Sequence, residues 1–244
     1  MQSKEPKRAN GRADDAMRPV RLEREVMKNA QGSCLVEFGD TRVLCAATVE
    51  EGVPSWRRSS HAGWVTAEYA MLPASTGRRT ARETGKRKGR SMEIERLIGR
   101  SLRTVVDMRR LGEYTVTVDC DVIQADGGTR TASITGAWVA LHDALMSWVD
   151  AGKIARLPLT GQVAAVSMGV VAGCELLDLD YLEDSSADVD MNLVAADTGE
   201  IIELQGTGER TPFDRARLNR LLDLGDLGIK KLIALQNEVT GFRD

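Results

Sequence analysis

The chain has 244 residues, of which 42% are apolar and 28% are charged, so it can bury a core and is not globally disordered. The longest apolar run, residues 163–173, is too short to span a bilayer. The polar beginning of the chain lacks a signal-peptide pattern, and we therefore expect a cytoplasmic protein that does not associate with membranes. Only two histidines are present, which argues against zinc hydrolase and Ser-His-Asp chemistry.

Charge is distributed unevenly along the chain. Residues 1–130 contain 24 Lys and Arg against 18 Asp and Glu, whereas residues 131–244 contain 9 against 18. The basic excess lies in residues 74–90, where the single acidic residue is Glu83. Because guanidinium groups grip phosphates, this basic loop is either a polyanion-binding segment or a solvated loop in an arginine-rich protein. Its basic residues are Arg78, Arg79, Arg82, Lys86, Arg87, Lys88 and Arg90.

In chain order, residues 1–18 are expected to form an irregular arm, followed by a β-hairpin that turns at Gly39 and Asp40. A helical period extends over residues 90–110, and a second helix with one apolar stripe opens near Thr129. Each half reads as strands followed by a helix, which predicts an internally duplicated α+β fold. Strands are expected at 33–38, 42–49, 63–70, 114–123, 163–171, 175–179, 189–195 and 200–204, and a final helix at 214–236.

The sequence Gly-Gly-Thr-Arg at residues 127–130, which we call the glycine loop, lies between a predicted strand and a predicted helix. Glycines allow close approach of an anion, and a helix N-terminus offers free N–H donors. Thr129 can cap the helix and Arg130 adds a cation, but no Walker A or G-x-G-x-x-G motif is present. The loop is therefore either a phosphate cradle or a glycine turn with a threonine cap.

Residues 183–190 contain four carboxylates: Glu183, Asp184, Asp188 and Asp190. Oxygen ligands of this kind suit magnesium, and the alternation around Val189 predicts that Asp188 and Asp190 share one strand face. A solvated acidic loop is the alternative interpretation. Arg90, at the start of the first long helix, opposes the helix dipole and hints at a bound anion. Together these features indicate phosphate chemistry on a polyanion.

Five segments carry a resemblance to a known family. They are residues 63–73 (GWVTAEYAMLP), 89–103 (GRSMEIERLIGRSLR), 119–137 (DCDVIQADGGTRTASITGA), 177–184 (LDLDYLED) and 190–192 (DMN). Through these motifs, and over about residues 11–228, the chain closely resembles bacterial ribonuclease PH.

The resemblance implies a ribosomal protein S5 domain 2-like fold, with an N-terminal arm at 1–18 and a single catalytic domain at 19–244. It implies a phosphorolytic 3′→5′ exoribonuclease that trims tRNA precursors and other RNA 3′ ends, with inorganic phosphate as co-substrate and Mg²⁺ or Mn²⁺ as cofactor. A homohexamer, built as a trimer of dimers, is also implied. The implied site comprises a phosphate site of Arg90, Gly128, Thr129 and Arg130, catalytic and metal-linked Asp184 and Asp190, and RNA contacts from Arg78, Arg79 and Arg82.

The expected reaction is in-line attack by phosphate on the terminal internucleotide phosphorus. Arg90 and Arg130 would orient the phosphate, while Asp184 and Asp190 would hold magnesium or protonate the leaving group. One alternative is an inactive ring subunit of an exosome-like complex that only threads RNA. Another is a small-molecule phosphotransferase, which the basic loop disfavours.

Overall fold

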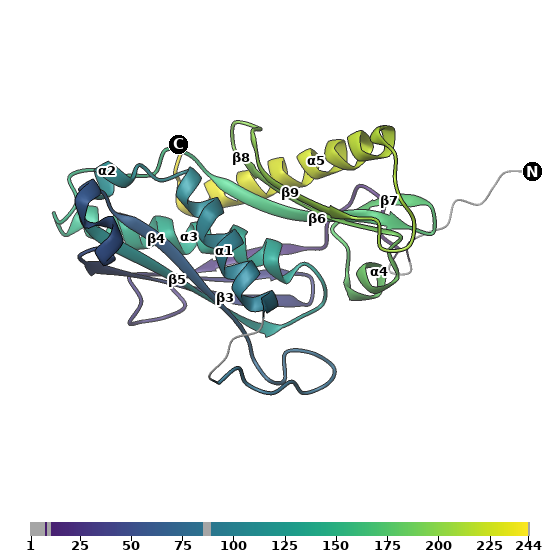
Figure 1. Ribbon diagram of the computed structural model, residues 1–244, viewed down its shortest axis with the longest axis horizontal. Helices are drawn as coiled ribbons and strands as arrows, with labels where there is room; N and C mark the ends of the chain where they lie inside the picture. Colours follow the sequence, from purple (N-terminus) through teal and green to yellow (C-terminus); the bar gives the residue numbers. More distant parts are fainter. Residues whose placement is uncertain (1–7, 9–10, 85–88, 244) are drawn as a thin grey trace, which may run out of the picture.

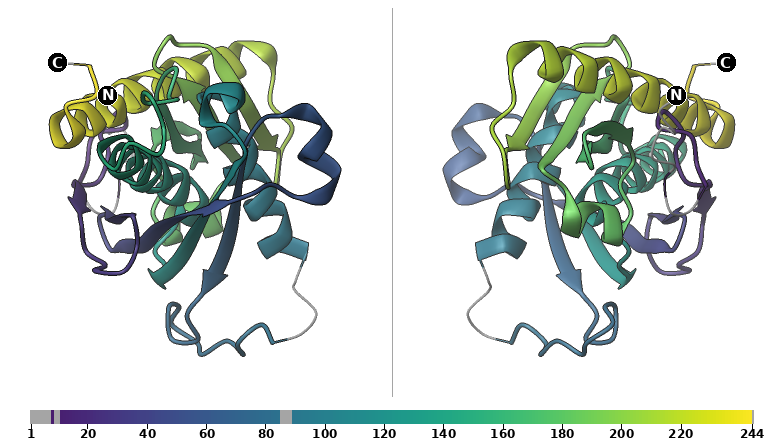
Figure 2. Two further views of the ribbon diagram at one scale, coloured as in Figure 1. Left: turned by 90° about the vertical axis from the view of Figure 1, so that its left-hand side faces the viewer. Right: turned by 90° about the vertical axis from the view of Figure 1, so that its right-hand side faces the viewer.

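The structure, a computed structural model, describes residue 8 and residues 11–84 and 89–243. Lys86, Arg87 and Lys88 of the basic loop, together with residues 1–7 and 9–10 of the arm, therefore lie outside the described residues. Two β-sheets flank one long helix, α3 (Thr129–Asp150), and a second long helix lies along the outer side of the C-terminal sheet (Figures 1 and 2).

The N-terminal sheet has five strands in the order β1-β2-β3-β5-β4, antiparallel except for the β4–β5 pair. Valines and Cys120 at alternate positions of β5 are buried, as a two-residue period requires. The parallel pair needs a crossover, which α1 (Gly89–Thr104) and α2 (Met108–Leu111) supply. The strands are β1 (Val20–Arg24), β2 (Gly32–Phe38), β3 (Thr41–Glu51), β4 (Trp64–Met71) and β5 (Tyr114–Gln124).

The C-terminal sheet has four antiparallel strands in the order β7-β6-β8-β9. Helix α5 (Arg215–Thr240), capped by Asp214, packs against β6 and β7, while the short helix α4 (Tyr181–Ser186) connects β7 to β8. The strands are β6 (Val163–Val171), β7 (Cys174–Leu177), β8 (Val189–Ala196) and β9 (Ile201–Thr207).

Helix α3 packs on β2 and β3 on one side and on β6 on the other. As a result residues 131–145 are all buried, so the burial extends beyond the apolar stripe that the sequence predicts. Small side chains permit the close packing: a Cβ added at Gly136 would lie 2.5 Å from a Val36 methyl carbon. The N-terminus of this buried helix is thereby fixed relative to both sheets.

The α+β architecture expected from the sequence is confirmed, with local differences. The helix predicted over residues 90–110 ends at Thr104, because Val106 forms a β-bridge with Leu159 and Asp107 then caps the separate helix α2. Strand β1 was not expected. The first part of the acidic segment 183–190, for which a solvated loop was one of two interpretations, lies in helix α4, and this helix begins with a capping box between Asp180 and Glu183.

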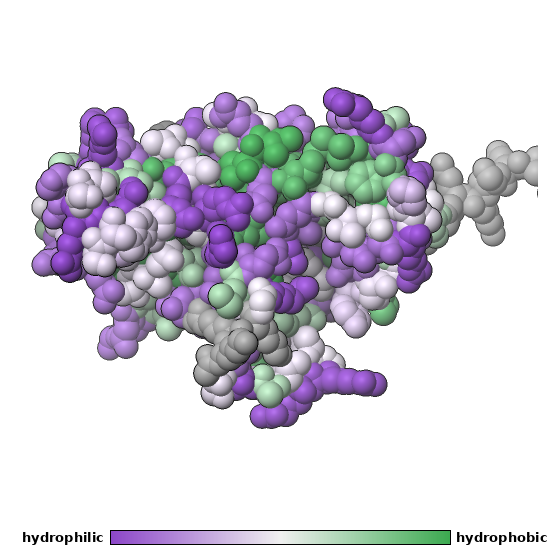
Figure 3. Space-filling view, viewed as in Figure 1, coloured by the Kyte–Doolittle hydropathy of each residue, from purple (hydrophilic) through white to green (hydrophobic). Residues whose placement is uncertain are grey.

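Apolar side chains gather over the C-terminal sheet and α5 on the face drawn in Figure 3. Ile201 and Leu204 of the edge strand β9 and Leu227 of α5 are among the exposed large apolar residues. Among the helices in the described part of the chain, none has the length and apolar character that crossing a bilayer requires.

Candidate active site

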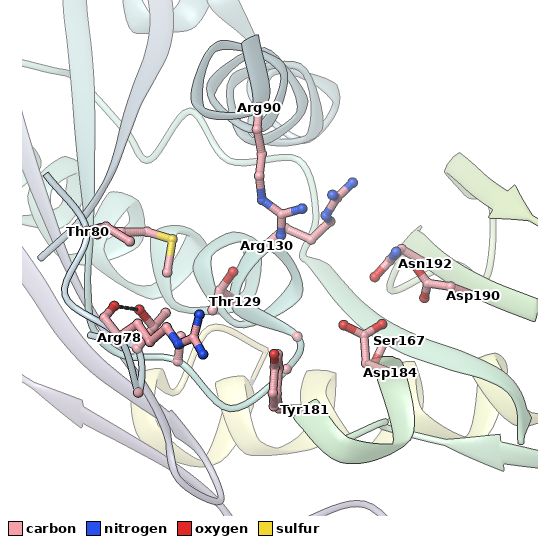
Figure 4. A pocket seen from close by; sticks show the side chains of 16 residues that line it. Arg78, Thr80, Arg90, Thr129, Arg130, Ser167, Tyr181, Asp184, Asp190 and Asn192 are labelled. Atoms are coloured by element: carbon pink, nitrogen blue, oxygen red, sulfur yellow. Dashed lines mark hydrogen bonds between the residues drawn. The ribbon is translucent and has the colours of Figure 1, made fainter. Parts of the chain in front are cut away.

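A cleft of about 750 Å³ brings together segments that are far apart in the sequence (Figure 4). The glycine loop and Arg90 line it from the N-terminal half, and Asp184 and Asp190 line it from the C-terminal half. The other lining residues are Met71, Thr76, Gly77, Arg78, Thr80, Ala125, Ser167, Tyr181 and Asn192.

The glycine loop forms one wall of the cleft. Gly127 and Gly128 have φ angles of 76° and 66°, a left-handed conformation that glycine adopts without strain. Gly128, which has no side chain to cap the helix, is the N-cap of α3. The expected threonine cap is therefore wrong: the Thr129 hydroxyl lies 2.9 Å from the Tyr69 hydroxyl instead. The positive end of a 22-residue helix thus points into the cleft without a side-chain acceptor.

Two guanidinium groups lie above the glycine loop. Arg90, from the first turn of α1, and Arg130, from the first turn of α3, extend toward one another in Figure 4. Arg130 Nη1 donates to Gln205 at 2.6 Å and to Glu93 at 3.2 Å, whereas Arg90 forms no ion pair with any described residue. Two like charges beside a helix N-terminus favour an anion between them.

Asp184 of α4 and Asp190 of β8 lie opposite the arginines (Figure 4). Burial raises the pKa of Asp184, and the charges of Arg90 and Arg130 partly offset that rise. Burial, reinforced by the negative charge of Asp184, raises the pKa of Asp190 to about 6. Such a pair is stabilised by a shared proton or by a cation.

The donor set beside these carboxylates fits a hard divalent cation. The carboxylate oxygens and the side chain of Asn192, two residues beyond Asp190 on β8, line the same wall of the cleft. Carboxylate and amide oxygens with several waters are the ligands that Mg²⁺ prefers. No group of three His, Cys, Asp or Glu residues suited to a metal occurs among the described residues, so a cation here would retain water or substrate oxygens.

All the predicted site residues except Arg79 and Arg82 line this cleft. Those two lie in the basic loop beside it, next to Arg78, whose side chain does line the cleft. The prediction that Asp188 shares a strand face with Asp190 is wrong, because Asp188 precedes β8 and Asp190 alone of the two lines the cleft.

Tyr181, Asn192 and Ser167 were not predicted as site residues. Asn192 carried a usable signal, since it follows Asp190 by two residues on a strand and so shares its face. Tyr181 became recognisable only once α4 was known, because it is the first residue of that helix. Ser167 lies within a buried apolar strand, where sequence patterning gave no functional signal.

Similarity to known proteins extends over most of the chain. Three solved structures share the fold. A chain of the Archaeoglobus fulgidus exosome with RNA bound to the active site is 24% identical with a TM-score of 0.80, and the match covers 93% of this chain and 91% of that chain. Rice (Oryza sativa) Rrp46 is 20% identical with a TM-score of 0.78, covering 96% of this chain and 100% of that chain, and an archaeal exosome core is 24% identical with a TM-score of 0.76, covering 95% of this chain and 90% of that chain. Residues 16–147 match domain 1 of the 3′ exoribonuclease family and residues 161–226 match domain 2. The ribonuclease PH-like fold expected from the motifs is thereby confirmed, and the chain belongs to the 3′ exoribonuclease family.

Proposed function

We propose that the protein is a phosphorolytic 3′→5′ exoribonuclease of the bacterial ribonuclease PH type, which trims the 3′ ends of tRNA precursors and other structured RNAs. The observation that carries this proposal is the convergence of Arg90, the glycine loop, Asp184 and Asp190 on one cleft. These groups come from four separate elements, α1, α3, α4 and β8, so their meeting is a property of the fold and not of local sequence.

Inorganic phosphate is the proposed co-substrate. The N-terminus of α3, Arg90 and Arg130 would hold it and partly neutralise it, leaving one oxygen to attack the terminal internucleotide phosphorus in line. The new P–O bond forms as the bond to the 3′-oxygen breaks, and the terminal residue leaves as a nucleoside diphosphate. The reverse reaction would add a nucleotide from a nucleoside diphosphate.

We infer that Asp184 and Asp190 hold Mg²⁺ or Mn²⁺. A cation held there would supply charge stabilisation for the leaving 3′-oxygen and the phosphoryl group. The raised pKa of Asp190, about 6, also suits this carboxyl to donate the proton that the leaving oxygen needs. A magnesium titration over a range of pH separates the two roles.

The basic loop is the proposed RNA contact. Arg78 lines the cleft, and Arg79 and Arg82 continue the positive charge away from it, as binding of a phosphate backbone requires. Assembly into a homohexameric ring is supported by the exosome cores that share the fold and by the exposed apolar residues of the edge strand β9. Light scattering after size exclusion tests the mass of this assembly.

A ring subunit that threads RNA without cleaving it is the second candidate, supported by the similarity to exosome chains. The complete set of phosphate-binding and acidic residues in one cleft favours an active enzyme.

One assay distinguishes the two candidates. The protein is incubated with a 3′-extended tRNA and Mg²⁺, with and without inorganic phosphate, and the released nucleotide is identified. Nucleoside diphosphate that appears only with phosphate, and is lost in Arg130→Ala and Asp190→Ala, supports phosphorolysis. Release of monophosphate indicates hydrolysis, and RNA binding without release indicates the threading subunit.

A further inference from the structure

Arg18 joins the two walls of the cleft. Its Nη2 and Nε atoms donate to Oδ1 and Oδ2 of Asp178 at 2.7 and 3.0 Å, and its main-chain N–H donates to Oδ2 at 2.7 Å. The same guanidinium donates to the carbonyl oxygens of Asp126 and, at 3.5 Å, Gly127. The side chains of Arg18 and Asp178 are 6% and 1% exposed. The buried guanidinium of Arg18 therefore forms hydrogen bonds with both the glycine loop and the segment that leads to α4.

Asp178 has a left-handed backbone conformation. Its φ angle is 54°, a value that is uncommon outside glycine and that aspartate and asparagine adopt more readily than other residues. Its N–H donates to the Ser167 carbonyl at 2.7 Å, and its carboxylate is fixed by Arg18. Two residues later Asp180 caps α4, the helix that carries Asp184. The path of the chain into α4 is thus set at Asp178.

The two walls touch through their backbones at this point. A Cβ added at Gly127 would lie 2.7 Å from the Leu179 carbonyl oxygen and 2.9 Å from the Tyr181 nitrogen. Arg8 also constrains the acidic wall, because it donates to both carboxylate oxygens of Glu183, at 2.7 and 2.6 Å. Glu183 directly precedes Asp184, so its position also constrains the acidic wall.

We propose that Arg18 and Asp178 are positioning residues, whose buried ion pair fixes the separation between the glycine loop and the carboxylates Asp184 and Asp190. This inference rests on the proposed function. In-line attack requires a phosphate held by one wall to meet a phosphodiester bond held at the other, and displacement by about 1 Å can reduce a rate about 100-fold. Neither residue needs to contact the substrates.

Two conservative substitutions test the pair. Arg18→Lys keeps the positive charge but loses the bidentate hydrogen bonding of the guanidinium group. Asp178→Asn keeps the shape of the side chain, and asparagine tolerates the left-handed backbone. For each we expect kcat of phosphorolysis to fall about 10- to 100-fold, while KM for RNA stays within about twofold because the basic loop is untouched. We also expect faster amide hydrogen exchange in residues 126–132 and in residues 178–186.

The matched controls are Arg24→Lys and Asp143→Asn. Arg24 and Asp143 form an equally bidentate pair, at 2.8 and 2.7 Å, that joins β1 to α3 and lines a different cavity. These variants should lose stability but retain kcat, and they should leave exchange in the two cleft segments unchanged. Measurements are made well below each variant's Tm, so that all of the protein is folded.

The outcomes separate the two proposals. Wild-type kcat in both Arg18→Lys and Asp178→Asn, equal losses in the controls, or unchanged exchange in the two cleft segments would each overturn the positioning role. A wild-type protein that releases no nucleoside diphosphate refutes the proposed function instead, and the exchange pattern then decides the positioning role alone.

Discussion

Replacing Asp190 by asparagine should stabilise the metal-free protein at neutral pH. The pKa of Asp190 is raised from its ordinary 3.8 to about 6, because the carboxylate is buried and faces Asp184. One pKa unit corresponds to about 1.4 kcal/mol, so keeping Asp190 ionised in the folded state at pH 7 costs about 3 kcal/mol. Asparagine has nearly the shape of the protonated acid and carries no charge.

The sign of the pH dependence follows from the raised pKa. The folded state binds this proton more tightly than the unfolded state does, so the wild-type protein gains stability as the pH falls from 7 through 6 toward 4. The variant lacks this titration. We therefore expect the free energy of unfolding of Asp190→Asn to exceed that of the wild type by about 3 kcal/mol at pH 7, with the difference disappearing near pH 4.

Urea unfolding at several pH values, with a chelator present, measures this difference. Asp226→Asn, which removes an exposed carboxylate from α5, is the control for the change in net charge. Saturating Mg²⁺ should stabilise the wild type and narrow the gap, since the cation compensates the same charges. A variant that is less stable than the wild type at pH 7, or a difference that does not change with pH, would refute the reasoning.

Three further variants, one of them with a matched control elsewhere in the chain, address the cleft and the residues beside it. Gly127→Ala, which places a Cβ 2.7 Å from a backbone carbonyl at φ 76°, should cost about 3 kcal/mol of stability in urea unfolding. At Gly173, where φ is 85°, an added Cβ would have no atom within 4 Å, so Gly173→Ala should cost only about 1 kcal/mol of stability. Equal losses of stability in the two glycine variants would contradict the backbone contact at Gly127. Tyr69→Phe removes the 2.9 Å hydrogen bond to the glycine-loop threonine and should raise KM for phosphate about threefold to tenfold in steady-state assays; an unchanged KM would mean that the threonine hydroxyl is not needed. Combining Arg79→Gln with Arg82→Gln should raise KM for RNA and reduce the slope of log KM against log salt concentration by about two. An unchanged slope would mean that the RNA binds elsewhere.

Regular patterns in the sequence predicted most of the fold. The alternation along β5 and the glycine pair before α3 located both elements almost to the residue, because side-chain period and backbone freedom are local properties. Helix α4 was missed because four clustered carboxylates resemble a solvated loop. Its capping box, with Asp180 three residues before Glu183, was a local signal that could have identified it.

Motifs in the sequence located residues that line the cleft of the candidate site, whereas they gave no indication of the long-range contacts beside it. Arg90, Arg130, Asp184 and Asp190 stand out by residue type and setting, and the fold brings them to one cleft. The partner of Arg18, however, is 160 residues away in the sequence. A polar segment at the beginning of a chain carries no pattern that reveals such a partner, and it was therefore expected only as an irregular arm.

Helix α3 belongs to both halves of the molecule, because it packs on β2 and β3 as well as on β6. Neither sheet can lose its neighbour without exposing the apolar side chains of that shared helix to water. Although two family domains match successive parts of the chain, a single chain should therefore melt in one cooperative step, with a calorimetric enthalpy equal to the van't Hoff enthalpy.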